Sequence, residues 1–148
     1  MDMPRQIRHP HAEAGFTLLE LMVVIVILGL LATVVMVNVL PSQDRAMKEK
    51  ARADISVLEQ SIEGYRLDNF AFPTNEQRLQ ALGTPPAGMT RPARYREGGY
   101  IRRLPQDPWG NPYQYAVPGE KGRFDIYSFG ADGRKGGEGD DADIGNWS

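Results

Sequence analysis

Gly15-Phe16-Thr17-Leu18-Leu19-Glu20 opens an apolar run that continues to Leu40, and Glu20 is the only ionisable residue in that run. At about 1.5 Å per residue, the run is long enough to cross a hydrocarbon core of ~30 Å. A carboxylate in a membrane helix costs roughly 2.5–3.5 kcal/mol at the centre and less near an end, so a retained one usually has a partner. Cleavage after Gly15 would create an amine at Phe16, and pairing between Glu20 and a neighbour's amine would align identical subunits.

A removable secretory signal is the alternative to a membrane anchor. Such signals have a shorter apolar region and end at an A-x-A-like site. No such site lies between Ile27 and Leu40. The sequence therefore favours a retained anchor.

The composition argues against an enzyme. The chain has no cysteine, and its two histidines, His9 and His11, both precede Gly15. A chain cut at Gly15 would keep no thiol or imidazole to act as nucleophile, base or zinc ligand. Its net charge of −2 gives no reason to expect a nucleic-acid partner.

The residues after the anchor predict an amphipathic helix. Apolar residues recur there at spacings of three and four, namely Met47, Ala51, Ile55, Leu58, Ile62 and Tyr65. Asp44 and Lys48 have the i,i+4 order of a helical ion pair. The anchor and this apolar stripe, which runs from Met47 to Tyr65, together predict one helix over 16–69. A kink or local melting is expected at 37–41 because Pro41 removes a backbone donor.

The composition changes after Asn69, where most glycines and prolines lie. The pattern predicts a short helix over 76–82 and strands over 113–117 and 123–128, joined by a turn at 118–122. A two- or three-stranded antiparallel sheet packed on the helical stripe would bury both surfaces. The fold class is therefore α+β.

The segment from Gly99 to Tyr113 has the composition of a turn cassette. Asp107 and Asn111 can bond nearby backbone, and Trp109 offers a large apolar anchor. A structural role for Trp109 is favoured over an exposed subunit contact, since buried tryptophan is the commoner use.

The segment 129–144 carries four aspartates on a glycine-rich backbone, Asp132, Asp140, Asp141 and Asp143. Carboxylate and carbonyl oxygens in a flexible loop suit Ca²⁺, whereas Mg²⁺ needs a tighter octahedron. The spacing does not match an EF-hand. From spacing alone, a solvated acidic loop is an equal alternative.

Three segments carry a family resemblance. The G-F-T-L-L-E junction resembles the class III signal of type IV pilins and type II secretion pseudopilins. Residues 100–110 resemble the Y-I-R-R-L-P-x-D-P-W-G signature of major pseudopilins, and residues 128–147 resemble their calcium loop. The chain departs from that family at Val37, where major pseudopilins commonly carry proline.

The resemblance implies a type IV pilin-like fold and a set of functional residues. It implies a leader, residues 1–15, that a prepilin peptidase removes before methylating the Phe16 amine, then an anchor at 16–40. The head would span 41–148, with its helix at 41–69 and its loops and strands at 70–148. Calcium ligands would be, in order of expectation, the carboxylates of Asp132, Asp143, Asp141 and Asp140, with the carbonyl of Phe129.

The implied function is that of the major subunit of a type II secretion pseudopilus. Such a subunit is anchored once in the bacterial inner membrane with its head in the periplasm. It polymerises with itself and works with minor pseudopilins, an inner-membrane platform, an outer-membrane secretin and secreted proteins. The alternatives are a type IV pilin, a minor pseudopilin and, from another class, a periplasmic hydrolase with a metal held by the aspartates.

Overall fold

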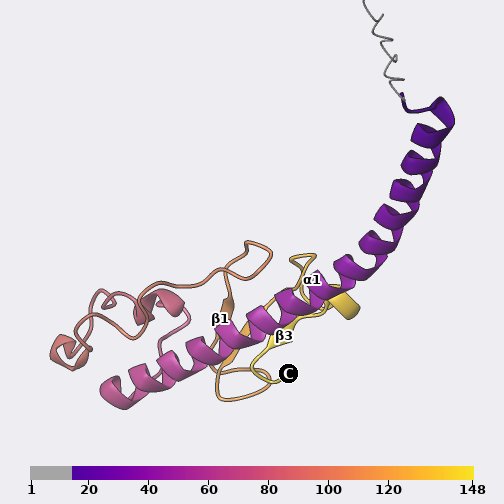
Figure 1. The fold of residues 1–148 in the computed structure, drawn as a ribbon. Coiled ribbons are helices and arrows are strands. Elements are labelled where there is room, and N and C mark those ends of the chain that lie inside the picture. Colours follow the sequence, from indigo (N-terminus) through magenta and orange to yellow (C-terminus); the bar gives the residue numbers. More distant parts are fainter. Residues whose placement is uncertain (1–14) are drawn as a thin grey trace, which may run out of the picture. The chain divides into compact units, whose positions relative to one another are not determined.

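The computed structural model describes residues 15–148, so the expected leader lies, apart from Gly15, outside the described residues. The chain divides into two compact units, 1–40 and 41–148. The element order is one long helix, then short 3-10 turns and three short strands. Figure 1 shows the long helix α1 with the strands β1 and β3 labelled.

Helix α1 spans Leu18–Asn69, which confirms the prediction of a single long helix. The helix continues through Pro41, so the expected local melting is wrong. A bend there stays a prediction, and the side chains of residues 38–41 lie outside the description. An isolated proline can be held within a helix when neighbouring turns keep their hydrogen bonds, at a cost of about 3 kcal/mol or more.

The core of the second unit is built on the predicted stripe. Its helical members are buried: Ala51, Ile55, Leu58, Ile62 and Tyr65. Met47, at the stripe's first position, is only half-buried. The opposing side is supplied by Leu79, Ala81, Leu82, Tyr113, Phe124, Ile126 and Ile144. Each fully buried Leu or Ile contributes roughly 1.5–3 kcal/mol, which makes this face the main attachment of the helix to the rest of the unit.

The sheet is antiparallel with the order β1-β2-β3. Strand β1 spans Gln114–Ala116, β2 spans Asp125–Ser128 and β3 spans Ile144–Gly145. Tyr115 lies opposite Ile126, and Ser128 lies opposite Ile144. The α+β prediction is confirmed, and both predicted strands exist but are shorter than expected.

The turn between β1 and β2 is held by a buried carboxylate. Asp125 Oδ2 accepts hydrogen bonds from the backbone N–H groups of Glu120 and Lys121 at 2.6 and 3.0 Å, and its Oδ1 accepts one from Gly122 at 3.1 Å. These bonds satisfy turn donors that no strand partner reaches. They also explain why β2 begins only at Asp125, two residues later than predicted.

The helix predicted over 76–82 is largely wrong. Only a 3-10 segment, η1 at Leu79–Leu82, forms there. Thr74 and Gln77 exchange two hydrogen bonds, from Gln77 N to Thr74 Oγ1 at 3.2 Å and from Thr74 N to Gln77 Oε1 at 3.0 Å. This reciprocal bonding favours a turn over residues 74–78. Two further 3-10 segments are η2 at Pro92–Arg94 and η3 at Gly139–Asp141.

Candidate functional site

The first turn of α1 is closed by a reciprocal pair of hydrogen bonds. Thr17 N donates to Glu20 Oε2 at 3.1 Å, and Glu20 N donates to Thr17 Oγ1 at 3.2 Å. This is a capping box, in which Thr17 is the N-cap and Glu20 the third helical residue. The sequence reasoning gave Glu20 no partner inside its own chain, although the T-x-x-E spacing carries the signal for one. Gly15 and Phe16 precede the helix, and both are exposed.

The apolar part of α1 is uncovered within the first unit. Leu18, Ile25 and Leu30 are 77%, 67% and 65% exposed, and every described side chain from Phe16 to Val37 is exposed. By length and composition this helix can cross a membrane. A helix that is apolar on all faces needs lipid or other apolar helices around it.

The cassette at 99–113 supports the base of the glycine-rich segment. Buried Asp107 accepts backbone hydrogen bonds at Oδ1 from Trp109 and Asn111, at 3.1 and 2.7 Å. Its Oδ2 accepts a 2.6 Å hydrogen bond from the hydroxyl of Ser128, whose Oγ in turn accepts one from Gly130 N at 3.1 Å. Asp107 thus ties the cassette to the end of β2, where the aspartate-rich loop begins. Trp109 is half-buried and packs against the core, as predicted.

Three of the expected calcium ligands, Asp132, Asp141 and Phe129, are exposed or half-buried. Asp132 is exposed, and its Oδ1 accepts a hydrogen bond from Arg134 N at 3.0 Å. Asp141 is exposed. Phe129 is half-buried, with its ring 5.3 Å from that of Tyr127.

Asp143 and Asp140 differ sharply from each other. Asp143 Oδ2 accepts a hydrogen bond from Gly136 N at 3.0 Å, while its Oδ1 is buried without a partner. A buried carboxylate oxygen with no donor or cation is costly, so this atom fits a metal ligand. Asp140 instead forms an ion pair with Lys48, 2.6 Å between Oδ1 and Nζ. The expected pairing of Lys48 with Asp44 is therefore wrong, since the loop carboxylate takes that position.

The described residues, 15–148, contain no group of three or more acidic, histidine or cysteine side chains gathered closely enough to hold a metal. All five glycines of the segment have positive φ, namely Gly130, Gly133, Gly136, Gly137 and Gly139. A β-carbon at Gly130 would lie 2.8 Å from the carbonyl oxygen of Ala142. The backbone of this segment therefore folds back on itself closely, which positions its two ends side by side without bringing the carboxylates together.

Residues 38–147 match the family described as "Type II secretion system (T2SS), protein G", and residues 10–36 match the prokaryotic N-terminal methylation motif. The chain belongs to the type II secretion system protein G family. Core protein G of Vibrio cholerae is 55% identical over 136 residues, covering 92% of this chain and 92% of the relative. Core protein G of Pseudomonas aeruginosa is 51% identical over 135 residues, covering 91% and 95%.

A solved structure agrees with this assignment to the protein G family. The major pseudopilin from the type 2 secretion system of enterohaemorrhagic Escherichia coli matches with a TM-score of 0.65 and 46% identity, over 74% of this chain and 90% of that chain. The findings support the secretion pseudopilin over the type IV pilin alternative. They also associate the chain with self-assembly, membrane anchoring and other components of a secretion system.

Proposed function

We propose that this protein G family member is the major structural subunit of a type II secretion pseudopilus and polymerises through its N-terminal helix. One observation carries the proposal: a helix apolar on all faces, uncovered in its own unit, begins with a carboxylate at Glu20. Lipid can cover such a helix in the inner membrane, and copies of the same helix can cover it in a filament. The filament would help move folded proteins across the outer membrane.

Processing would occur between Gly15 and Phe16. Both residues are exposed and precede the first helical turn, so a prepilin peptidase could reach the bond without unwinding α1. Removal of the leader would create the Phe16 amine, and methylation of that amine would follow. The methylation motif matched over residues 10–36 supports this order of events.

Glu20 would pair with the Phe16 amine of a neighbouring subunit. The capping box uses only Oε2 of the carboxylate, which leaves Oε1 available to accept from an incoming ammonium group. In a low-dielectric helix core, such a charge-assisted hydrogen bond is much stronger than in water. The pairing would therefore set the register between copies.

Calcium would crosslink the aspartate-rich segment. The unpartnered Oδ1 of Asp143 supports the proposal, and the carboxylates of Asp132 and Asp141, with the Phe129 carbonyl, would complete the set. Asp140 fits less well because Lys48 already neutralises it. Bound calcium supplies an electrostatic staple in a chain that has no cysteine for disulfides.

The head would lie in the periplasm, and the chain would act as a structural subunit with no catalytic role. Its partners would include prepilin peptidase, minor pseudopilins, the inner-membrane platform, the outer-membrane secretin and secreted proteins. The absence of cysteine, and of histidine after His11, supports the non-enzymatic assignment.

The deciding experiment is the intact mass of the chain co-expressed with a prepilin peptidase. We expect a product that begins at Phe16 and carries one added methyl group. An uncut product, or one cut beyond Leu40, would remove the amine that Glu20 needs, and the filament mechanism would be wrong.

A further inference from the structure

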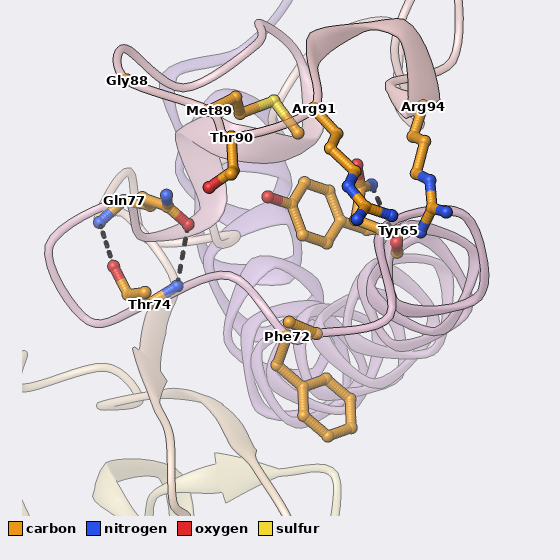
Figure 2. A pocket seen from close by; sticks show the side chains of 11 residues that line it. Tyr65, Phe72, Thr74, Gln77, Gly88, Met89, Thr90, Arg91 and Arg94 are labelled. Carbon is orange, nitrogen blue, oxygen red and sulfur yellow. Dashed lines mark hydrogen bonds between the residues drawn. The ribbon is translucent and has the colours of Figure 1, made fainter.

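A pocket of about 410 Å³ opens where the C-terminal end of α1 meets the segment 88–94. Figure 2 shows Tyr65 on the helix side, Arg91 and Arg94 reaching toward the helix from the other side, and the ring of Phe72 pointing away from these residues. Thr74 and Thr90 add hydroxyl groups to its wall. The pocket therefore combines aromatic surface with two guanidinium groups, and the proposed mechanism uses none of these residues.

The two arginines of the pocket lack an acidic partner among the described residues. Neighbouring arginines have one: Arg66 pairs with Glu63 at 2.7 Å, and Arg96 pairs with Asp68 at 3.2 Å. Guanidinium groups are strong bidentate binders of carboxylates. The pocket thus offers two cationic groups to a carboxylate from outside the chain.

Phe70 lies beside this pocket in a costly conformation. Its φ is 60°, its side chain is 74% exposed, and the Arg94 guanidinium lies 4.6 Å from its ring centroid. A left-handed backbone costs a non-glycine residue roughly 1–2 kcal/mol. Non-glycine residues in such conformations concentrate at binding sites. An exposed aromatic ring here extends the pocket into a docking surface.

A buried acceptor at the pocket adds a second requirement. Asn69 donates through Nδ2 to Tyr65 O and to Tyr100 Oη, both at 2.9 Å, but its Oδ1 is buried with no partner. Asn69 lines the same pocket. The occupant should therefore supply a hydrogen-bond donor as well as a negative charge. A backbone rich in N–H groups and carboxylates meets both needs.

The segment 136–141 of this same chain has that chemistry. It presents Glu138 between two glycines, it is exposed throughout, and no ion pair to Glu138 forms within the described residues. It lies at the other end of the head's helix, because Asp140 pairs with Lys48. The separation from Lys48 to Tyr65 is 17 helical residues (65 − 48), or about 25 Å.

We infer that the pocket receives the segment 136–141 of a second copy, with Glu138 paired to Arg91 and Arg94 and the glycine backbone packed on Phe70. The two complementary surfaces lie at opposite ends of the head, so the contact is head-to-tail. A heterologous contact of this kind propagates as an open helical assembly unless its rotation closes a ring. The inference rests on the proposed filament and adds a head contact to its helical core.

Charge reversal tests the contact in filaments assembled from the full chain. We expect Arg91→Glu with Arg94→Glu to lower the filament yield at least about tenfold, because like charges would face each other. Adding Glu138→Lys should restore much of the yield. Arg78→Glu reverses an exposed charge at a residue that lines neither the pocket nor the cavity beside Gly136, and it should leave the yield unchanged. Circular dichroism of each purified variant would show whether the head is folded.

Cysteine crosslinking gives an independent readout, since the chain has no cysteine of its own. Thr90→Cys combined with Glu138→Cys should yield a ladder of covalent oligomers after oxidation, and neither single variant should. A disulfide needs Cα atoms within about 7 Å, so this pair cannot close within one subunit. The contact alone would be overturned if the wild-type chain forms filaments, the charge-reversed variants give an unchanged filament yield, and no covalent ladder appears. A wild-type chain that forms no filament would overturn the proposed function and this contact with it.

Discussion

Lys48 Nζ lies 2.6 Å from Asp140 Oδ1, and this ion pair joins α1 to the segment that carries the proposed calcium ligands. The two side chains are 24% and 55% exposed, so the pair contributes only ~0–1 kcal/mol to stability. Its main consequence concerns calcium binding, because the Lys48 ammonium group already neutralises one aspartate of the loop. Asp143, whose Oδ1 has no partner, has no such competitor.

The aspartates of the loop should therefore differ in calcium binding. We expect Asp143→Asn to weaken calcium binding by more than about tenfold, because it removes charge from a ligand oxygen. Asp140→Asn should change the affinity by less than about threefold. Isothermal titration calorimetry of the detergent-solubilised full chain measures both. Equal losses from the two variants would contradict the separate roles assigned to these residues.

Two substitutions at Glu20 should separate its charge from its capping role. Glu20→Gln keeps an oxygen that can accept from Thr17 N, whereas Glu20→Ala loses the cap, at a cost of about 1 kcal/mol of helix stability. We expect both variants to be processed at Gly15, and both to assemble poorly because neither can pair with an amine. The measurement is filament yield by electron microscopy alongside intact mass. Normal assembly of Glu20→Gln would mean that only the cap matters.

Ser128 should be more important to the head than its size suggests. It is fully buried, and its hydroxyl bridges the Asp107 carboxylate and Gly130 N. Ser128→Ala leaves both partners buried with a missing bond, which costs about 1–3 kcal/mol. Urea unfolding followed by tryptophan fluorescence would report the change. Ser56→Ala, at an exposed position of the same unit, is the matched control; equal stability of the two variants would refute the bridge.

The head should lose stability in alkali. Burial, and then the hydrogen bond that Tyr113 donates to Asp54 at 2.9 Å, raise the pKa of Tyr113 above its ordinary value of 10.0. Burial likewise raises the pKa of Tyr115. Above about pH 10 the unfolded chain then binds fewer protons than the folded chain, so the free energy of unfolding falls as the pH rises.

Tyr113→Phe should make that alkaline decline less steep. At neutral pH the same variant should lose about 0.5–1.5 kcal/mol, because it lacks the hydrogen bond to Asp54. Urea titrations at several pH values between neutrality and strong alkali provide both numbers. An unchanged slope would show that Tyr113 is not a source of the linkage.

Sequence reasoning succeeded where a pattern was local and repeated. The three- and four-residue spacing from Ala51 to Tyr65 identified the buried face of α1, since helical geometry alone places those residues together. The strand pair was found from alternation, but β3 was not located, because two residues carry no period. Asn146, which follows β3, adds a side-chain bond to β2, since its Oδ1 accepts from Ile126 N at 3.2 Å.

Contacts between segments that are far apart in the sequence could not be predicted from residue spacing. Local spacing suggested Asp44 as the partner of Lys48, yet the loop supplies Asp140 from the far end of the chain. The basic pocket depends on how segment 88–94 returns to the end of α1, and no periodicity encodes that return. The capping box at Thr17 is different, since the T-x-x-E pattern of Thr17 and Glu20 is local and is readable from the sequence.

The position of that capping box has a consequence for the timing of assembly. Both members of the box follow the proposed cut, so the precursor and a mature subunit would share the same first helical turn. Proteolysis would place a charged amine at the new N-terminus and would leave the conformation of the first helical turn unchanged. Precursors stored in the membrane would then need no refolding before use. The supply of competent subunits would depend on the speed of one peptide-bond cleavage, and a cell could regulate filament growth there.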